Sequence, residues 1–197
     1  MSEWFEADNA PVGQGNTTAK SDVPAERDML NRLCREAIAY DCGDPKRIQH
    51  FIKVHALAKL IAESEGVDAH TRFVLEAAAY LHDIGIHKAE DLLGDCGGKN
   101  QEKLGPGEAA PILERCGFSE ADAQRVCFLI AHHHTYTGID GADWQILLEA
   151  DMLVNLFEDG AGEHAARSAL ERVFKTETGK ELCCQMFLEP RAITPGE

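Results

Sequence analysis

Residues 68–84 read DAHTRFVLEAAAYLHDI, and this stretch decides the fold. Apolar side chains recur in it with the period of an α-helix and form one broad face. The members of that face are Val74, Leu75, Ala78, Leu81 and His82. Asp83 follows directly, so two polar side chains stand at the most apolar end of a predicted helix. Both need partners there, because burying an unpaired carboxylate or imidazole costs free energy.

The same period runs along most of the chain, and no alternating strand pattern of any length interrupts it. The expected helices are 24–40, 45–66, 68–84, 105–116, 119–133, 143–158, 163–175 and 179–188. A glycine-rich break, LLGDCGGKN, covers residues 92–100. Asp140 is an expected N-cap, with Asp143 at the third helical position. We therefore predict an all-α fold, a single helical bundle of roughly 7–9 helices.

Length and composition limit the organisation and the partners. The 197 residues suggest one domain over 23–190, with an N-terminal tail over 1–22 and a C-terminal tail over 191–197. A net charge of −15 disfavours nucleic acid and anionic membranes as partners. The seven cysteines are odd in number and no export signal is present, so we expect a cytoplasmic protein with reduced thiols. The apolar segment LCCQMFL is either core or the contact of a homodimer.

Candidate metal ligands lie on four of the predicted helices. They are His50 in the second, His82 and Asp83 in the third, His132, His133 and His134 in the fifth, and Asp151 in the sixth. Each alone has an ordinary structural explanation, such as a hydrogen bond to a neighbour, but a divalent cation would satisfy all of them together. Two or three imidazoles with two carboxylates suit Mn, Fe, Co, Ni or Zn, and suit Mg or Ca less well.

The order H-x(31)-HD followed by a late Asp in the segment EAD resembles the HD superfamily of metal-dependent phosphohydrolases. The segments RIQHFIKVHALAKLIAESEG and AAAYLHDIGI are similar to the first-His helix and the HD helix of that family, and the resemblance covers about residues 45–160. It implies that His50, His82, Asp83 and Asp151 are the metal ligands.

Two-metal members of the family have two further histidines. For the later one we favour His133 and then His132, after Ile130. The matching place of the earlier one holds Gln101 or Glu102, so either the site takes one ion, or Glu102 or Glu108 stands in as a ligand. We favour one ion, with two as the alternative.

The predicted function is hydrolysis of a small phosphomonoester or nucleotide by a metal-activated water, with Asp83 orienting the water or accepting its proton. His87, Lys88 and Lys53 are the candidate partners of the substrate phosphate. Two alternatives stay open: a non-catalytic module that binds a metal or nucleotide, and a di-iron oxygenase of the same fold.

Overall fold

The computed structural model describes residues 23–95 and 97–189, and these residues form nine helices and no strand. The helices are α1 (Val23–Tyr40), α2 (Pro45–Ser64), α3 (Ala69–Leu81), α4 (Ile86–Leu93), α5 (Gly98–Cys116), α6 (Glu120–Ile130), α7 (Ala142–Glu158), α8 (Glu163–Arg172) and α9 (Glu177–Phe187). The prediction of an all-α fold is confirmed. Both predicted tails, 1–22 and 191–197, lie outside the described residues.

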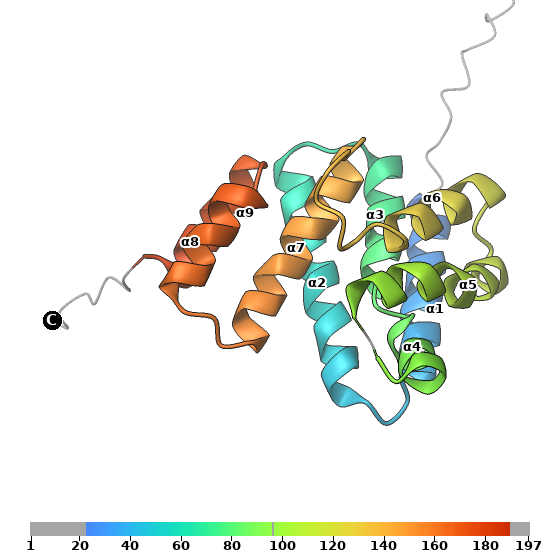
Figure 1. Cartoon of the computed structure of the whole chain (residues 1–197). Coiled ribbons are helices and arrows are strands. Elements are labelled where there is room, and N and C mark those ends of the chain that lie inside the picture. The colour runs from blue at the N-terminus through green and yellow to red at the C-terminus, as the bar shows by residue number, and fades with distance from the viewer. Residues whose placement is uncertain (1–22, 96, 190–197) are drawn as a thin grey trace, which may run out of the picture.

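Helices α2, α3 and α7 pack against one another in the middle of the molecule. Helices α1, α4, α5 and α6 lie on one side of this group, and α8 and α9 lie on the other (Figure 1). The run Ala77–Ala79 makes α3 narrow at its centre, and all three alanines are buried. Small side chains let neighbouring helices approach α3 closely from several directions, so its C-terminal end lies deep in the bundle.

The starts of α2 and α3 are fixed by side-chain caps. The carboxylate of Asp44 accepts a hydrogen bond of 3.1 Å from the backbone N–H of Arg47, and Pro45 occupies the first turn. Asp68 accepts hydrogen bonds from the N–H groups of His70 and Thr71 at the start of α3. These caps satisfy N–H groups that have no partner inside a helix. They set where α2 and α3 begin, and thus where their later turns place His50 and His82.

The predicted glycine-rich break over residues 92–100 does separate two helices, but it is too long, and the residues left out of the predicted helices on both sides of it are helical. Residues Ile86–Leu93 form α4, and α5 begins at Gly98 and continues through Pro106 and Pro111. Only Gly94, in the left-handed conformation with φ of 65°, acts as a stop. A Cβ on Gly85 would lie 2.8 Å from the carbonyl oxygen of Gln101. Glycine here permits close packing of α5 against the turn after α3, which local sequence patterns do not show.

The predicted cap of α7 is also wrong. Gly141 precedes the helix and provides no side-chain cap. Arg125 of α6 instead donates hydrogen bonds to Asp140 at 2.7 and 2.9 Å and two bonds of 2.8 Å to Asp143. Bidentate arginine–carboxylate pairs are strong and geometrically specific. Both aspartates therefore tie α6 to the start of α7.

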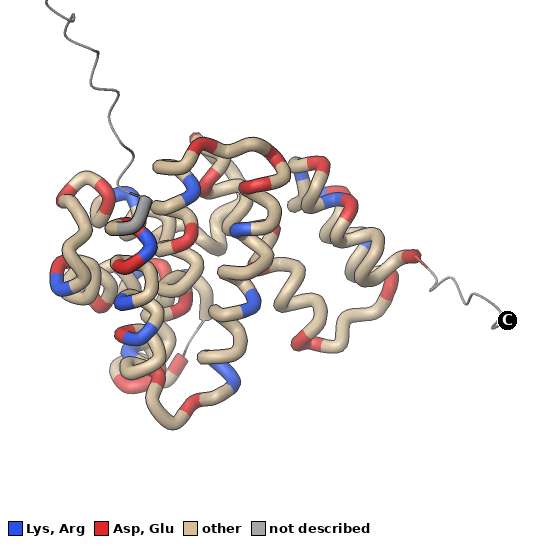
Figure 2. Tube along the Cα trace, turned by 180° about the vertical axis from the view of Figure 1, so that it is seen from behind, with Lys and Arg blue, Asp and Glu red and all other residues tan. Residues whose placement is uncertain are grey.

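Acidic residues are spread over the whole described trace, with lysine and arginine interspersed among them (Figure 2). None of the described helices has the length and apolar character that crossing a membrane requires. The six described cysteines are all free thiols.

Candidate metal centre

Side chains from α2, from α7 and from the turn after α3 meet at one point inside the bundle. The Nε2 atom of His50 lies 3.1 Å from Nε2 of His82, 3.2 Å from Oδ1 of Asp151 and 3.5 Å from Oδ2 of Asp83. The Nε2 atom of His82 lies 3.4 Å from the same Asp151 oxygen. Ligand atoms about 2.1 Å from a metal ion are separated from one another by about 3.0–3.4 Å in octahedral and tetrahedral shells. The spacing of His50, His82 and Asp83 therefore suits a shared cation, and Asp151 lies within ligand spacing of both histidines.

The second nitrogen of each ring fixes its orientation. Nδ1 of His82 donates to the backbone oxygen of Ala79 at 3.0 Å. Nδ1 of His50 lies 3.2 Å from a carboxylate oxygen of Glu158, which Lys53 holds at 2.6 Å. Such contacts from Nδ1 leave the lone pair of Nε2 free for a metal and are the usual second contact of a ligating histidine. The donor set thus fits a metal ion.

When no cation is bound, protons on the histidines offset the negative charge of the carboxylates in this cluster. Burial lowers the pKa of His50, but the hydrogen bond to Asp151 and the nearby carboxylates outweigh burial and raise it to about 9. Burial would raise the pKa of Asp151, yet hydrogen bonds from His50 and His82 hold it below its ordinary range. A metal ion must displace these protons, so metal affinity should fall as the pH falls.

A second group of possible ligands shares Asp83 with the first. It consists of Asp83, His133 and His134. Oδ1 of Asp83 lies 3.3 Å from Nε2 of His133, while Oδ2 faces His50 and His82. His133 is fully buried, and its Nδ1 donates to the backbone oxygen of Ile130 at 2.7 Å. The carboxylate of Asp83 therefore stands between two clusters of imidazoles.

Gln101 of α5 occupies the matching place at which the sequence lacks a histidine. Its Oε1 lies 3.3 Å from Nε2 of His133 and 3.0 Å from Nε2 of His134. From the sequence His134 was a candidate together with its two neighbours, but His133 and then His132 were favoured over it. The sequence could not distinguish it from its neighbours, because the backbone turn at the three consecutive histidines decides which rings point inward.

Three of the alternative ligands do not join these groups. His132 turns away, with its Nδ1 bonded to the carbonyl of Phe128 and its ring stacked on the Phe128 ring. Glu102 accepts hydrogen bonds from the His134 N–H and the Thr135 hydroxyl, so it shapes the loop after α6. Glu108 accepts a bond from Tyr40 and pairs with Lys88 at 3.4 Å.

The three residues predicted to bind the substrate phosphate do not line the pocket over the cluster. Lys53 pairs with Glu158, and Lys88 pairs with Glu108. His87 contacts Asp41, at 3.2 Å, and Arg47, and it belongs to α4 rather than to a loop. The described residues that line the pocket over the cluster include none of these three. They include two cations that sequence reasoning missed, Lys46 and Arg47 in the first turn of α2.

The pocket over the cluster has a volume of about 430 Å³. Besides members of both ligand groups, its lining contains Asn155 and Glu158, one and two turns after Asp151 on α7. The Asn155 amide donates a hydrogen bond of 2.9 Å to the Asp151 carboxylate. This spacing could have identified both residues, because positions four and seven apart share a helix face.

Comparisons with known proteins agree with this geometry. The model of the HD domain matches residues 47–173. The chain is 30% identical to a predicted HD superfamily hydrolase from an uncultured Thermotogales bacterium, over 81% of this chain and 83% of that chain, with a TM-score of 0.54. It is 20% identical to YpgQ of Bacillus subtilis, over 82% and 89% of the two chains, with a TM-score of 0.55, a likeness of fold alone. The comparison with curated proteins gives no match.

Proposed function

The chain belongs to the HD domain family, and from this premise we propose that it is a metal-dependent phosphohydrolase for a small phosphorylated substrate. The observation that carries the proposal is that the Nε2 atoms of His50 and His82 lie 3.1 Å apart, and each lies 3.2–3.6 Å from a carboxylate oxygen of Asp83 and of Asp151. The similar Thermotogales protein is described as a predicted hydrolase of this superfamily.

In this proposal one divalent ion is held by His50, His82, Asp83 and Asp151. The mixed nitrogen and oxygen donors favour Mn, Fe, Co, Ni or Zn over Mg. Such an ion supplies Lewis acidity and lowers the pKa of a coordinated water toward neutrality. The overlap of the two groups at Asp83 supports the alternative of a second ion at Asp83, His133 and His134.

Asp83 is the proposed catalytic residue. Its side chain is 24% exposed, whereas that of Asp151 is 4% exposed, so Asp83 is the more open of the two carboxylates. Contacts with His133 on one oxygen and with His50 and His82 on the other fix its orientation. The carboxylate would orient the attacking water and accept its proton while the water oxygen bonds to phosphorus and the ester oxygen leaves.

The lining of the pocket favours a small substrate. Lys46 makes no hydrogen bond or ion pair with its side chain among the described residues, so its ammonium group is available to a phosphate. Arg47 is held by Asp44 and Glu90 at 3.0 and 2.7 Å, which fixes its guanidinium at the pocket. Asp44, Glu158 and Asp159 also line the pocket and would repel a long polyanion.

The test is phosphate release from a panel of nucleotides and small phosphomonoesters. Protein stripped of metal receives Mn, Fe, Co, Ni, Zn or Mg separately, and the bound metal is counted by elemental analysis. Asp83→Asn removes the proposed catalytic carboxylate, and Asp28→Asn, on the exposed face of α1, is the matched control. We expect turnover that needs a transition metal, persists in the control and disappears in Asp83→Asn.

Folded, metal-loaded protein that releases no phosphate from any substrate would refute the hydrolase and favour a metal-binding module. Two irons per chain together with oxygen consumption would favour the oxygenase. Two bound ions per chain together with hydrolysis would support the proposed reaction, but they would replace the one-ion site by two ion sites that share Asp83.

A further inference from the structure

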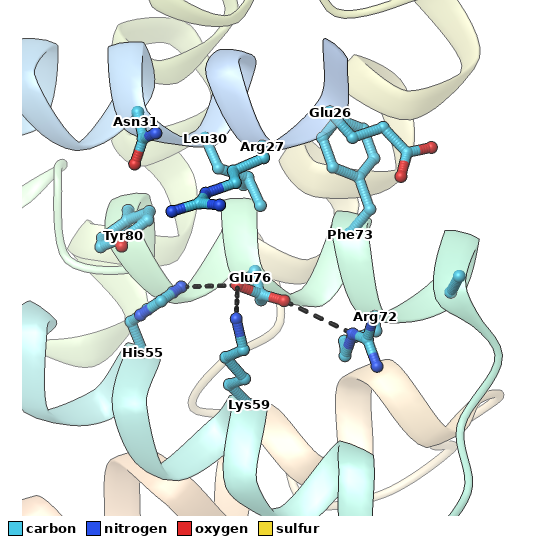
Figure 3. A pocket seen from close by; sticks show the side chains of 11 residues that line it. Glu26, Arg27, Leu30, Asn31, His55, Lys59, Arg72, Phe73, Glu76 and Tyr80 are labelled. Carbon is cyan, nitrogen blue, oxygen red and sulfur yellow. Dashed lines mark hydrogen bonds and ion pairs between the residues drawn. The ribbon is translucent and has the colours of Figure 1, made fainter. Parts of the chain in front are cut away.

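A second pocket, of about 230 Å³, lies between α1, α2 and α3 and shares no lining residue with the pocket over the metal cluster. His55 and Lys59 reach it from α2, Arg72 and Glu76 from α3, and Arg27 from α1 (Figure 3). His55 comes five residues after His50, which turns its side chain by about 140° around the helix axis. The pocket therefore opens on a different face of α2 from the metal cluster.

Cationic groups surround a single buried carboxylate in this pocket. Glu76 is 5% exposed, and its Oε2 lies 2.9 Å from Nε2 of His55 and 3.6 Å from Nζ of Lys59. Arg72 approaches the other oxygen at 3.6 Å, and Arg27 extends from α1 on the opposite side of the pocket (Figure 3). Arg72 also lies 3.5 Å from Glu63, at the rim, but two carboxylates cannot saturate the donors of these four side chains.

The side-chain N–H groups of Lys59, Arg27 and Arg72 are available to a ligand. The ion-pair distances of Lys59 and Arg72 are 3.5–3.6 Å, longer than the usual range of an N–H···O hydrogen bond. Within residues 23–95 and 97–189, none of Arg27, Lys59 and Arg72 donates a hydrogen bond from its side chain. Arg47 and Arg125, by contrast, form bonds of 2.7–2.9 Å to carboxylates.

The charge of the lining is opposite to that of the protein. Arg27, Lys59 and Arg72 stand against Glu26 and Glu76, a surplus of positive charge before any proton on His55, whereas the whole chain has a net charge of −15. Aromatic rings form part of the wall, since Tyr80 stacks on His55 with ring centroids 4.0 Å apart. A concave surface with convergent cations and an aromatic wall suits a small anion.

We propose that this pocket binds a small phosphate-bearing anion through Arg27, Lys59 and Arg72. A tetrahedral phosphate accepts hydrogen bonds from several directions, and these donors approach from three different helices, whereas a planar carboxylate accepts mainly in its own plane. The volume exceeds the roughly 150 Å³ of a cavity that holds benzene, so a phosphate with a small organic group fits.

Binding here would join the helices that carry the metal cluster. Lys59 shares α2 with His50, and Arg72 lies on α3, which ends at His82. A phosphate that bridges the two cations would therefore hold α2 against α3 at the side remote from the cluster.

The experiment is calorimetric titration of the full chain with inorganic phosphate and, separately, pyrophosphate, at low ionic strength and in the presence of a chelator. The chelator prevents anions from binding through a metal. Arg27→Ala/Lys59→Ala removes two of the donors, and both side chains are solvent-accessible, so the core stays intact. Arg167→Ala/Lys180→Ala changes the net charge equally at exposed positions of α8 and α9.

We expect a site that is weakened at least about tenfold in the pocket double variant and unchanged in the control double variant. Arg47→Ala, which alters the pocket over the metal cluster, should leave this binding unchanged, so the result does not depend on the proposed hydrolysis. Absence of a site in the wild-type chain, wild-type affinity in the pocket double variant, or equal weakening in both double variants would each overturn the proposal.

Discussion

Replacement of Gly85 by alanine tests whether close packing of α5 shapes the metal centre. The backbone of Gly85 has φ −75° and ψ −10°, which any residue adopts, so alanine brings no backbone strain. Its Cβ, however, would lie 2.8 Å from both the carbonyl oxygen of Gln101 and the N–H nitrogen of Gly105. Both are main-chain atoms, and ordinary contact begins at 3.4 Å, so α5 must retreat by more than half an ångström.

The expected cost follows from two opposing effects. Overpacking of a core costs about 1–3 kcal/mol, and loss of the glycine's freedom in the unfolded chain returns about 0.4–1 kcal/mol. The net loss of about 1–2 kcal/mol corresponds to a fall in Tm of about 2–8 °C for a domain of this size. Gly107, on the same helix α5, is the matched control, because a Cβ there meets nothing within 4 Å. Gly107→Ala should raise the free energy of unfolding by up to about 1 kcal/mol.

Urea unfolding of the two variants measures these free energies, and titration with Mn measures the metal affinity of each. Gly85→Ala should also weaken metal binding, because the crowded Cβ strains the turn that carries Asp83, a proposed ligand, and retreat of α5 withdraws Gln101 from His133 and His134. A Gly85→Ala protein as stable as Gly107→Ala would refute the close approach of α5. Lower stability with unchanged metal affinity would show that the packing does not shape the site.

Two further predictions concern buried carboxylates. Glu149 accepts hydrogen bonds from the N–H groups of Lys175 and Thr176 ahead of α9. Glu149→Ala should lower the free energy of unfolding by about 1–3 kcal/mol and speed amide exchange at both positions. Exchange rates equal to those of the wild-type protein would contradict the anchoring role. For Glu76, burial raises the pKa, but His55 and nearby cations outweigh burial and lower it from 4.5. Because folding lowers this pKa, the ionised carboxylate stabilises the folded state at pH values above 4.5. The wild-type protein should therefore be more stable than Glu76→Gln at neutral pH, and this difference should shrink as acid protonates Glu76. A difference in urea midpoint that does not change with pH would contradict the prediction.

The helical period was enough to predict the fold class, and the order of His50, the HD pair and Asp151 was enough to indicate the family. The ligand set itself stays a prediction. The error at residues 86–104 has a physical cause. Glycine indicates a turn when only local preference is considered, but Gly85 and Gly105 serve a contact between helices, and such a contact has no local signature. His87 and Lys88 were chosen for closeness in sequence to the HD pair, and Lys53 for closeness to His50. Yet Lys88 and Lys53 are each paired with a carboxylate distant in sequence.

Helix ends explain why the histidines of the centre stand where they do. A helix leaves its last carbonyls without backbone partners. His82 follows α3 and binds the Ala79 carbonyl with Nδ1, and His133 follows α6 and binds the Ile130 carbonyl in the same way. Each ring is thus oriented by its own helix end, where the partial negative charge also favours a cation.

His50 lies inside α2, where the carbonyls are used by the helix, so its ring needs a partner from elsewhere. Glu158 provides that partner from the end of α7, and Lys53 holds the carboxylate in turn. The orientation of His50 therefore depends on packing of α7 against α2, whereas His82 and His133 depend on local geometry. The sequence names all three histidines, but only the ring orientations of His82 and His133 follow from local structure, while that of His50 requires the folded bundle.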